Sequence, residues 1–342
     1  MLKTIAFNSW MQRIGGRSRR FWLTYFDIGA AMGIGLLIFV IYSFIRNILN
    51  LLYHPSQGGQ TLLIIPLPGL TISWDIFPYI LISIAALLIP HEVAHGIASV
   101  IDHVPIKSSG VFLAIFLPGG FVEIDEEDLA KRKARTKLRV FAAGSSTNVV
   151  SWFLVFIALI ALFQPAPSGV LVTGLTSGGA SEGIIPQWSV ITHLNNNNIT
   201  QTQDLSLALT KITPGTTVTV GTNNGNSYQI TTKSSPLNSS RAALGVSVAD
   251  YHALRGGLLP LSSAFQLLLA LNWMSLILLG VALVNMLPLF PFDGDRYFDT
   301  VLRVFGLQNT RVLRILASTI SLALLLSNLV LSYVLFGTIF PK

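Results

Sequence analysis

The sequence predicts a polytopic α-helical membrane protein with about five or six transmembrane segments, a short membrane-associated β segment and an inserted small α/β domain. Three observations lead to this fold class. Charged residues make up 11% of the 342 residues, less than half of the roughly 25% that soluble domains carry. The mean hydropathy is +0.64. Several apolar segments reach the length of about 20 residues that a helix needs to cross a bilayer.

Five apolar segments have this length. They lie at residues 28–45, 77–101, 140–163, 258–287 and 316–336. Two shorter apolar stretches, 62–72 and 111–117, are too short to span. Prolines interrupt the first of them, and we interpret the second as a strand or re-entrant segment that leads into Pro118-Gly119-Gly120.

The polar residues between the third and fourth segments predict a separate small domain. We therefore divide the chain into an N-terminal membrane region (1–164), an inserted domain (165–257) and a C-terminal membrane region (258–342). β-rich runs at 169–175, 216–221 and 228–232 predict strands in the insert, with turn signals such as Asn224-Gly225 between them. One short helix is expected at 205–211, capped by Thr202 or Asp204.

The positions of Lys and Arg predict the orientation in the membrane. They gather in the first 20 residues and in segments 131–137 and 296–314, whereas residues 51–79 contain none. Because cytoplasmic loops carry an excess of Lys and Arg, we expect a cytoplasmic N-terminus and an extracytoplasmic domain at 165–257. The same bias explains the net charge of +7, so we expect the lipid bilayer and not nucleic acid as a partner. The basic first 20 residues lack a continuous apolar core and are not expected to be a cleavable signal peptide.

The motif His91-Glu92-Val93-Ala94-His95 is the strongest chemical signal in the chain. Residues four apart share one helix face, so both imidazoles can reach one zinc ion. Glu92 lies beside them and can exchange a proton with a water molecule whose pKa the metal lowers toward about 7. Glu92 is also about 18 Å along the second span from Ile80. An ionisable group at that depth is costly without a partner or a function.

A hydrolytic zinc site needs a third protein ligand, and the chain has no cysteine. Asp293 is the preferred candidate, because prolines interrupt the membrane segment before it and broken helices at membrane depth can line a cavity. Asp295, two residues later, is its nearest rival. Asp27 begins the first apolar segment, where we interpret it as a helix cap. The remaining histidines (His54, His103, His193 and His252) fall in loops or just beyond a span and are poorer candidates.

These motifs resemble the site-2 protease family of intramembrane metalloproteases, some members of which carry an inserted PDZ domain. The resemblance covers HEVAH, the Asp-Gly pair about 200 residues later, and the Pro118-Gly-Gly-Phe-Val-Glu segment, which looks like the membrane-associated β-hairpin of these enzymes. It implies that His91, His95 and Asp293 bind one Zn²⁺ ion and that Glu92 is the general base. Asp295 stands where the family more often has glycine.

The family also has an Asn after the charged loop, within a Gly-Pro-x-x-Asn pattern. Here the run is Gly144-Ser145-Ser146-Thr147-Asn148, which lacks the proline. Asn148 is therefore a candidate catalytic residue that positions substrate or stabilises the oxyanion, or else makes an interhelical hydrogen bond. Asn285 carries the same ambiguity. Residues 165–250 resemble a PDZ domain, which would accept a peptide or substrate tail as an added strand or would only cover the site.

The sequence thus predicts a zinc metalloendopeptidase that cuts membrane-embedded protein substrates in regulated intramembrane proteolysis. A spanning substrate helix hides its amides, so part of it must unwind, and we expect 111–117 to offer an edge strand for the unwound segment. The alternative is a non-catalytic membrane scaffold or chaperone that uses the PDZ-like domain. A transporter would predict internal repeats, which the sequence lacks.

Overall fold

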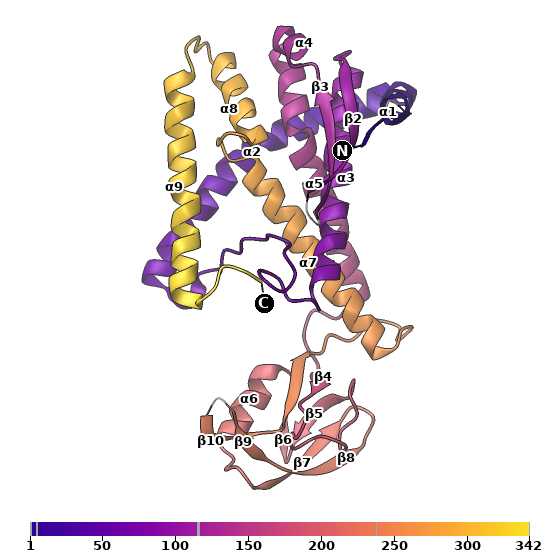
Figure 1. The fold of residues 1–342 in the computed structure, drawn as a ribbon, viewed down its shortest axis with the longest axis vertical. Helices are drawn as coiled ribbons and strands as arrows, with labels where there is room; N and C mark the ends of the chain where they lie inside the picture. Colours follow the sequence, from indigo (N-terminus) through magenta and orange to yellow (C-terminus); the bar gives the residue numbers. More distant parts are fainter. Residues whose placement is uncertain (1, 5, 115–116, 237, 342) are drawn as a thin grey trace. The chain divides into compact units, whose positions relative to one another are not determined.

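The computed structural model describes residues 2–4, 6–114, 117–236 and 238–341. The chain forms two compact units (Figure 1). The first unit comprises Met1–Phe156 and Ala270–Lys342, and the second comprises Ile157–Leu269. Each unit is described by itself below.

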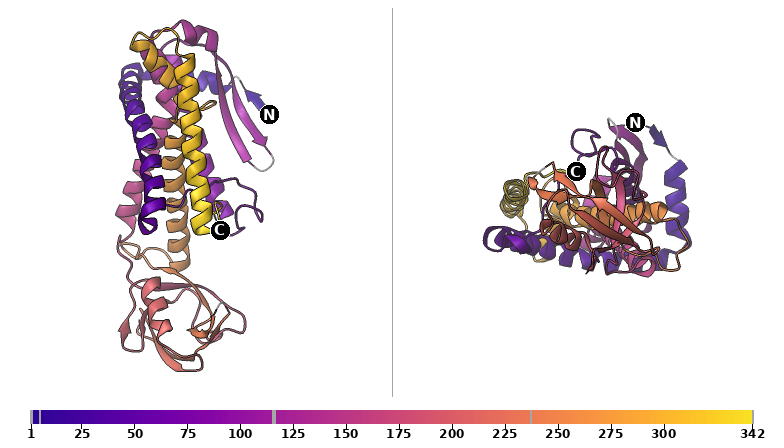
Figure 2. Two further views of the ribbon diagram at one scale, coloured as in Figure 1. Left: turned by 90° about the vertical axis from the view of Figure 1, so that its left-hand side faces the viewer. Right: turned by 90° about the horizontal axis from the view of Figure 1, so that it is seen from below.

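Five helices among the described residues are long and apolar enough to cross a membrane. They are α2 (Arg19–Tyr53), α3 (Phe77–Ile101), α5 (Ala134–Leu162), α7 (Leu261–Asn285) and α9 (Arg311–Phe336). Each contains or overlaps one of the five predicted apolar segments, so the predicted fold class of a polytopic helical membrane protein is confirmed. The long helices run alongside one another in the first unit, and the hairpin of strands lies on their flank (Figure 2).

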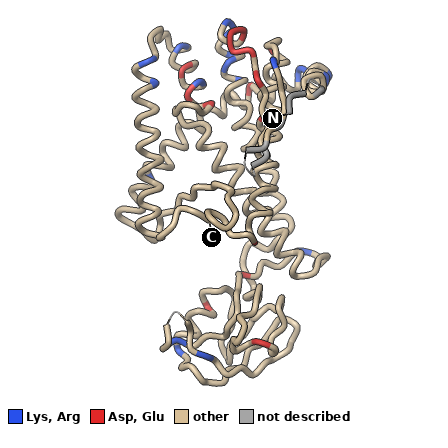
Figure 3. Tube along the Cα trace, in the orientation of Figure 1, with Lys and Arg blue, Asp and Glu red and all other residues tan. Residues whose placement is uncertain are grey.

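Shorter elements complete the first unit. They are β1 (Leu2–Thr4), α1 (Ala6–Arg17), the 3-10 turn η1 (Pro55–Gln57), β2 (Ile106–Ala114), β3 (Leu117–Ile124), α4 (Glu126–Lys131) and α8 (Asp293–Val304). Charged residues of this unit gather at the end that carries α4 and α8 (Figure 3). α4 begins after Asp125, whose carboxylate accepts hydrogen bonds from the backbone of Glu127 and Asp128 at 3.1 Å each, as an N-cap residue does.

The β segment predicted at 111–117 falls within an antiparallel hairpin of β2 and β3, although residues 115 and 116 lie outside the described residues. β1 pairs with the other side of β2, which gives the strand order β1-β2-β3. β2 is therefore the central strand. Among the described residues, β1 pairs with residues 109–111 of β2. The expectation that 111–117 supplies a free edge is therefore wrong at Val111 and stays a prediction for 112–114, while the edge beside α3 belongs to β3.

Small residues let the helices of the first unit approach closely. A Cβ on Gly96 of α3 would lie 2.2 Å from Met11 Sδ of α1, and a Cβ on Gly33 of α2 would lie 2.8 Å from the ring of Tyr297 in α8. Both partners are fully buried. Such close approach is typical of helix contacts in membranes, where packing replaces the hydrophobic effect as the driving force.

An ion cluster around a buried arginine joins α5 to α2 and to the end of α3. Arg139 of α5 is 6% exposed, and it donates to both oxygens of Asp27 at 2.7 and 2.8 Å and to both oxygens of Asp102 at 3.0 Å. Asp27 also pairs with Arg135. The interpretation of Asp27 as a helix cap is wrong, because α2 begins eight residues earlier, at Arg19, and the carboxylate is turned toward α5.

The second unit is an antiparallel sheet with one helix packed on it. Its strands are β4 (Val170–Leu175), β5 (Val190–Leu194), β6 (Asn197–Asn198), β7 (Thr217–Thr222), β8 (Ser227–Thr231), β9 (Lys233–Ser235), β10 (Asn238–Ala243) and β11 (Val246–Asp250). The main sheet has the order β11-β4-β5-β7-β8, with β6 on β5 and with β9 and β10 in a separate pair. The predicted strands at 169–175, 216–221 and 228–232 correspond to β4, β7 and β8.

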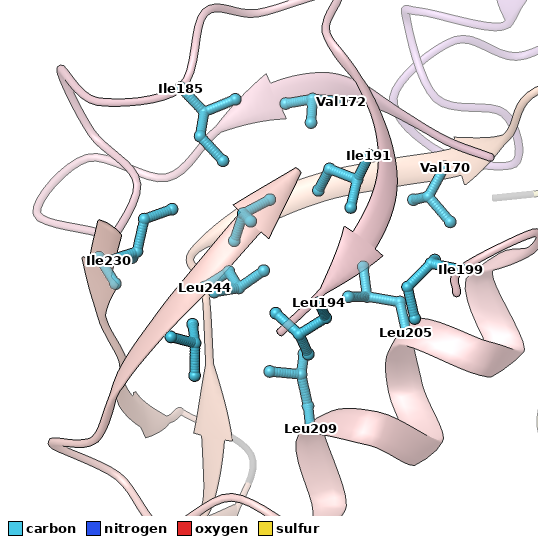
Figure 4. Packing of buried hydrophobic residues seen from close by; sticks show 13 residues of the cluster. Val170, Val172, Ile185, Ile191, Leu194, Ile199, Leu205, Leu209, Ile230 and Leu244 are labelled. Carbon is cyan, nitrogen blue, oxygen red and sulfur yellow. The ribbon is translucent and has the colours of Figure 1, made fainter. Parts of the chain in front are cut away.

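Apolar side chains at alternating strand positions, which share one face of the sheet, build the core of this unit. Val170, Ile191, Leu194 and Ile230 from the strands meet Leu205 and other apolar side chains of and around the helix (Figure 4). The helix is α6 (Thr202–Thr210), and Gln201 is its N-cap residue. Asp204 accepts hydrogen bonds from the backbone of Gln201 and Thr200 at 3.2 and 3.0 Å. The predicted cap at Thr202 or Asp204 is thus corrected to Gln201, with Asp204 as its reciprocal partner.

Candidate metal centre

Helix α3 brings His91 and His95 to one face, one turn apart. Their Nε2 atoms lie 3.1 Å from each other, and the two residues are 9% and 8% exposed. The spacing of four residues predicts this shared face. Two imidazole nitrogens therefore point into the same buried volume.

Asp293, the first residue of α8, reaches the same point from the other half of the chain. Its Oδ2 lies 3.1 Å from His95 Nε2 and 3.6 Å from His91 Nε2. Among the described residues, these three form a group whose ligand atoms all lie within 4.8 Å of one another. Gly294 allows the chain to fold back here, because a Cβ at that position would lie 2.2 Å from the carbonyl oxygen of Leu287.

The donor set fits a zinc ion. Zinc binds imidazole and carboxylate at about 2.0–2.2 Å in tetrahedral geometry, so neighbouring ligand atoms should lie about 3.3 Å apart. The separations among His91, His95 and Asp293 bracket this value. Three protein ligands leave the fourth position open for water or substrate, as hydrolytic zinc sites require.

Helix α5 contacts both histidines at Nδ1, the ring nitrogen that does not face Asp293. His95 Nδ1 lies 2.7 Å from the carbonyl oxygen of Val140, and His91 Nδ1 lies 2.9 Å from the side-chain amide of Asn148. Between these two contacts stands Gly144, where a Cβ would lie 2.3 Å from His91 Nε2. Val140, Gly144 and Asn148 follow one another at four-residue spacing and so share one face of α5.

The carboxylates near the site have separate partners. Asn285 at the end of α7 donates from Nδ2 to Asp293 Oδ2 at 2.8 Å. Asp295 is 3% exposed and forms an ion pair with Arg314 of α9. Asp293 is thus the carboxylate that lies beside the histidines. Asp295, the other candidate from the sequence, instead links α8 to α9 through its ion pair with Arg314.

Glu92 lies beside the histidines and next to the hairpin. Its Oε2 accepts a hydrogen bond from the backbone N–H of Val122 in β3 at 3.0 Å. That N–H points away from β2, because its partner lies on α3. A cavity of about 320 Å³ opens here, and its lining includes both histidines, Glu92, Asp293 and Val122.

Sequence reasoning brought His91, Glu92, His95 and Asp293 forward, and the structure brings all four to this cavity. The sequence does not predict that the missing side chain of Gly144 makes room for the ring of His91. The four-residue spacing of Val140, Gly144 and Asn148 was the signal available. His54, His103, His193 and His252 do not join the metal-ligand group of the described residues.

Comparisons with known proteins find a matching family model and several relatives. The family model of peptidase family M50 matches residues 79–328. A membrane-bound transcription factor site-2 protease homolog of Arabidopsis thaliana is 29% identical over 167 residues, which are 47% of this chain and 31% of that protein. An uncharacterised protein of Methanocaldococcus jannaschii is 26% identical over 227 residues, or 64% of this chain and 56% of that protein. The chain therefore spans about a third to a half of the length of these relatives.

A quarter of the chain is similar in structure to the PDZ domain of an SdrC-like protein from Listeria monocytogenes, with 15% identity, 92% coverage of that domain and a TM-score of 0.23. The family match is broader, since it covers most of the chain and includes both halves of the candidate metal centre. This chain therefore belongs to peptidase family M50.

Proposed function

We propose that this chain is an intramembrane zinc metalloprotease that hydrolyses peptide bonds in or near the transmembrane segments of membrane-bound proteins. The observation that carries the proposal is the convergence of His91, His95 and Asp293 beside Glu92, within a unit built from membrane-spanning helices. A zinc ion held there would supply a Lewis acid that polarises the attacking water and the substrate carbonyl.

Glu92 is the proposed general base and acid. Its carboxylate takes a proton from the attacking water and later delivers that proton to the nitrogen of the leaving amine, so the peptide bond is exchanged for a carboxyl and an amino terminus. Glu92 lies next to the ligand His91 in sequence and faces the same cavity. It is therefore close to the open position without being one of the ligands.

Strand β3 is the proposed platform for the unwound substrate. A spanning helix must lose some internal hydrogen bonds before its scissile amide can be attacked, and the backbone groups at a strand edge can replace them. The N–H of Val122 lies on the edge of β3 that faces Glu92. A substrate strand added at this edge would pass directly beside the proposed base.

The second unit is proposed to bind an extended peptide or a substrate tail. A groove of about 290 Å³ lies between α6 and the strands β10 and β11, and its lining includes Leu205, Leu209, Val246 and Val248. An apolar groove between a helix and a strand suits an added strand with apolar side chains. We propose that this unit is extracytoplasmic, that the N-terminus is cytoplasmic, and that peptide binding regulates proteolysis in the membrane.

The direct test replaces Glu92 by Gln in the full chain. We expect Glu92→Gln to bind zinc like the parent and to accumulate uncut membrane proteins, because the amide keeps the shape of the carboxylate but cannot take a proton. Cleavage products from a transmembrane substrate in proteoliposomes, measured alongside metal content, provide the readout. Undiminished cleavage by Glu92→Gln would remove the proposed role of Glu92.

A further inference from the structure

A histidine that binds a metal through Nε2 carries its proton on Nδ1, and this N–H needs an acceptor that fixes the ring. His95 has such an acceptor in the carbonyl oxygen of Val140, at 2.7 Å. His91 presents Nε2 to the same group of ligand atoms. Its Nδ1 must therefore also be protonated and must meet an acceptor.

The group that faces His91 Nδ1 is the side-chain amide of Asn148, which is completely buried. Its Nδ2 lies 2.9 Å from Nδ1, while its Oδ1 is buried without a partner among the described residues. The two ends of an amide have nearly the same shape, so their assignment follows from the hydrogen bonds. Beside a protonated Nδ1, the oxygen belongs in the position nearest the ring.

We propose that Asn148 is a positioning residue that accepts a hydrogen bond from His91 Nδ1 and thereby holds the ring in the zinc-binding tautomer and orientation. Val140 does the same for His95, eight residues earlier on the same face of α5. Gly144 stands between them and leaves room for the ring of His91. The three positions of α5 thus form one support for both zinc-binding histidines.

This inference rests on the proposed zinc site, and it differs from a role for Asn148 in binding substrate or the oxyanion. An oxyanion donor acts through Nδ2 and affects the rate of cleavage, with no reason to change the affinity for zinc. A positioning residue acts through Oδ1 and changes the affinity for zinc in the absence of substrate. The two roles therefore predict opposite results from the same substitutions.

The test measures zinc affinity by chelator competition on the purified full chain. Asn148→Leu keeps approximate volume but has no acceptor, and we expect it to bind zinc about 10- to 100-fold more weakly, as loss of a ligand's hydrogen-bond partner typically does. Asn148→Asp keeps an acceptor, and we expect its affinity to stay within about threefold of the parent. Asn148→Ala provides the same comparison if the leucine variant does not fold.

Asn328→Leu is the matched control, because Asn328 is an equally buried asparagine on α9 that contacts Asn47 instead of the site. We expect it to bind zinc like the parent. Parent-like zinc affinity in Asn148→Leu with loss of cleavage would overturn the proposal in favour of a substrate or oxyanion role, and weak zinc binding by Asn148→Asp would also contradict it. A parent chain without zinc affinity would instead remove the proposed function, and this inference with it.

Discussion

Replacing Gly144 by alanine would place a methyl group against the imidazole of His91. The added Cβ would lie 2.3 Å from Nε2 and 2.4 Å from Cε1, whereas carbon atoms in contact stay about 3.5–4.0 Å apart. The ring would have to move by more than about 1 Å, because α3 and α5 fix both backbones. Overpacking of this kind costs about 1–3 kcal/mol, and a cost of that size in the zinc-bound state weakens binding roughly 5- to 150-fold.

The assay is zinc affinity by chelator competition, together with cleavage of a transmembrane substrate in proteoliposomes. Gly280→Ala is the matched control, because Gly280 lies in a spanning helix and a Cβ there would meet nothing within 4 Å. We expect Gly144→Ala to lose zinc affinity and cleavage together and Gly280→Ala to retain both. Parent-like zinc binding by Gly144→Ala would refute the argument that His91 needs the space above Gly144.

Three further substitutions test other parts of the structure. Asp295→Asn should leave zinc content unchanged but lower the free energy of unfolding by about 1–3 kcal/mol, because it weakens the pair with Arg314. Arg139→Met should cost up to about 3 kcal/mol, because it leaves the carboxylates of Asp27 and Asp102 without their shared cation. Asp204→Ala should speed amide exchange in α6 at neutral pH. Hydrogen bonds from the Thr200 side chain and backbone hold the pKa of Asp204 below its ordinary value, so its stabilisation is present above that ordinary value and is lost as pH falls through the lower folded-state pKa.

Each of these three predictions is checked by a separate measurement, and each has a result that would contradict it. Unfolding of the first two variants can be followed in bicelles, where loss of zinc from Asp295→Asn would show that this carboxylate is a ligand after all. An Arg139→Met chain as stable as the parent would mean that the ion cluster is not a source of stability. Unchanged exchange of residues 202–210 in Asp204→Ala, at neutral pH, would contradict the capping role of this carboxylate.

The spanning helices could be predicted from the sequence because their signal is local. A helix in lipid satisfies its own backbone and needs only a long apolar run, so 77–101 was predicted with the bounds that α3 has. The HEVAH motif is equally local, since helix geometry alone places His91 and His95 on one face. The preference for Asp293 is also local, because the prolines that interrupt the membrane segment before it are visible in the sequence.

Features that depend on how separate elements align could not be predicted. The contacts of Gly144 and Asn148 with His91 require the register of α5 against α3, which hydropathy does not encode. Asp27 looked like a cap because its arginine partners lie more than 100 residues away. The edge position of β3 follows from the pairing of β1 with β2. The alternation of residues along a strand does not indicate which of two strands a third will pair with.

The zinc K-edge absorption spectrum of the purified full chain tests the central claim most directly. We expect about one zinc ion per chain, bound only by nitrogen and oxygen at about 2.0–2.2 Å, with two imidazole ligands that disappear in a His91→Ala, His95→Ala double variant and an altered first shell in Asp293→Ala. A folded chain that takes up no zinc, or one whose zinc spectrum is the same in those variants as in the parent, would contradict the account.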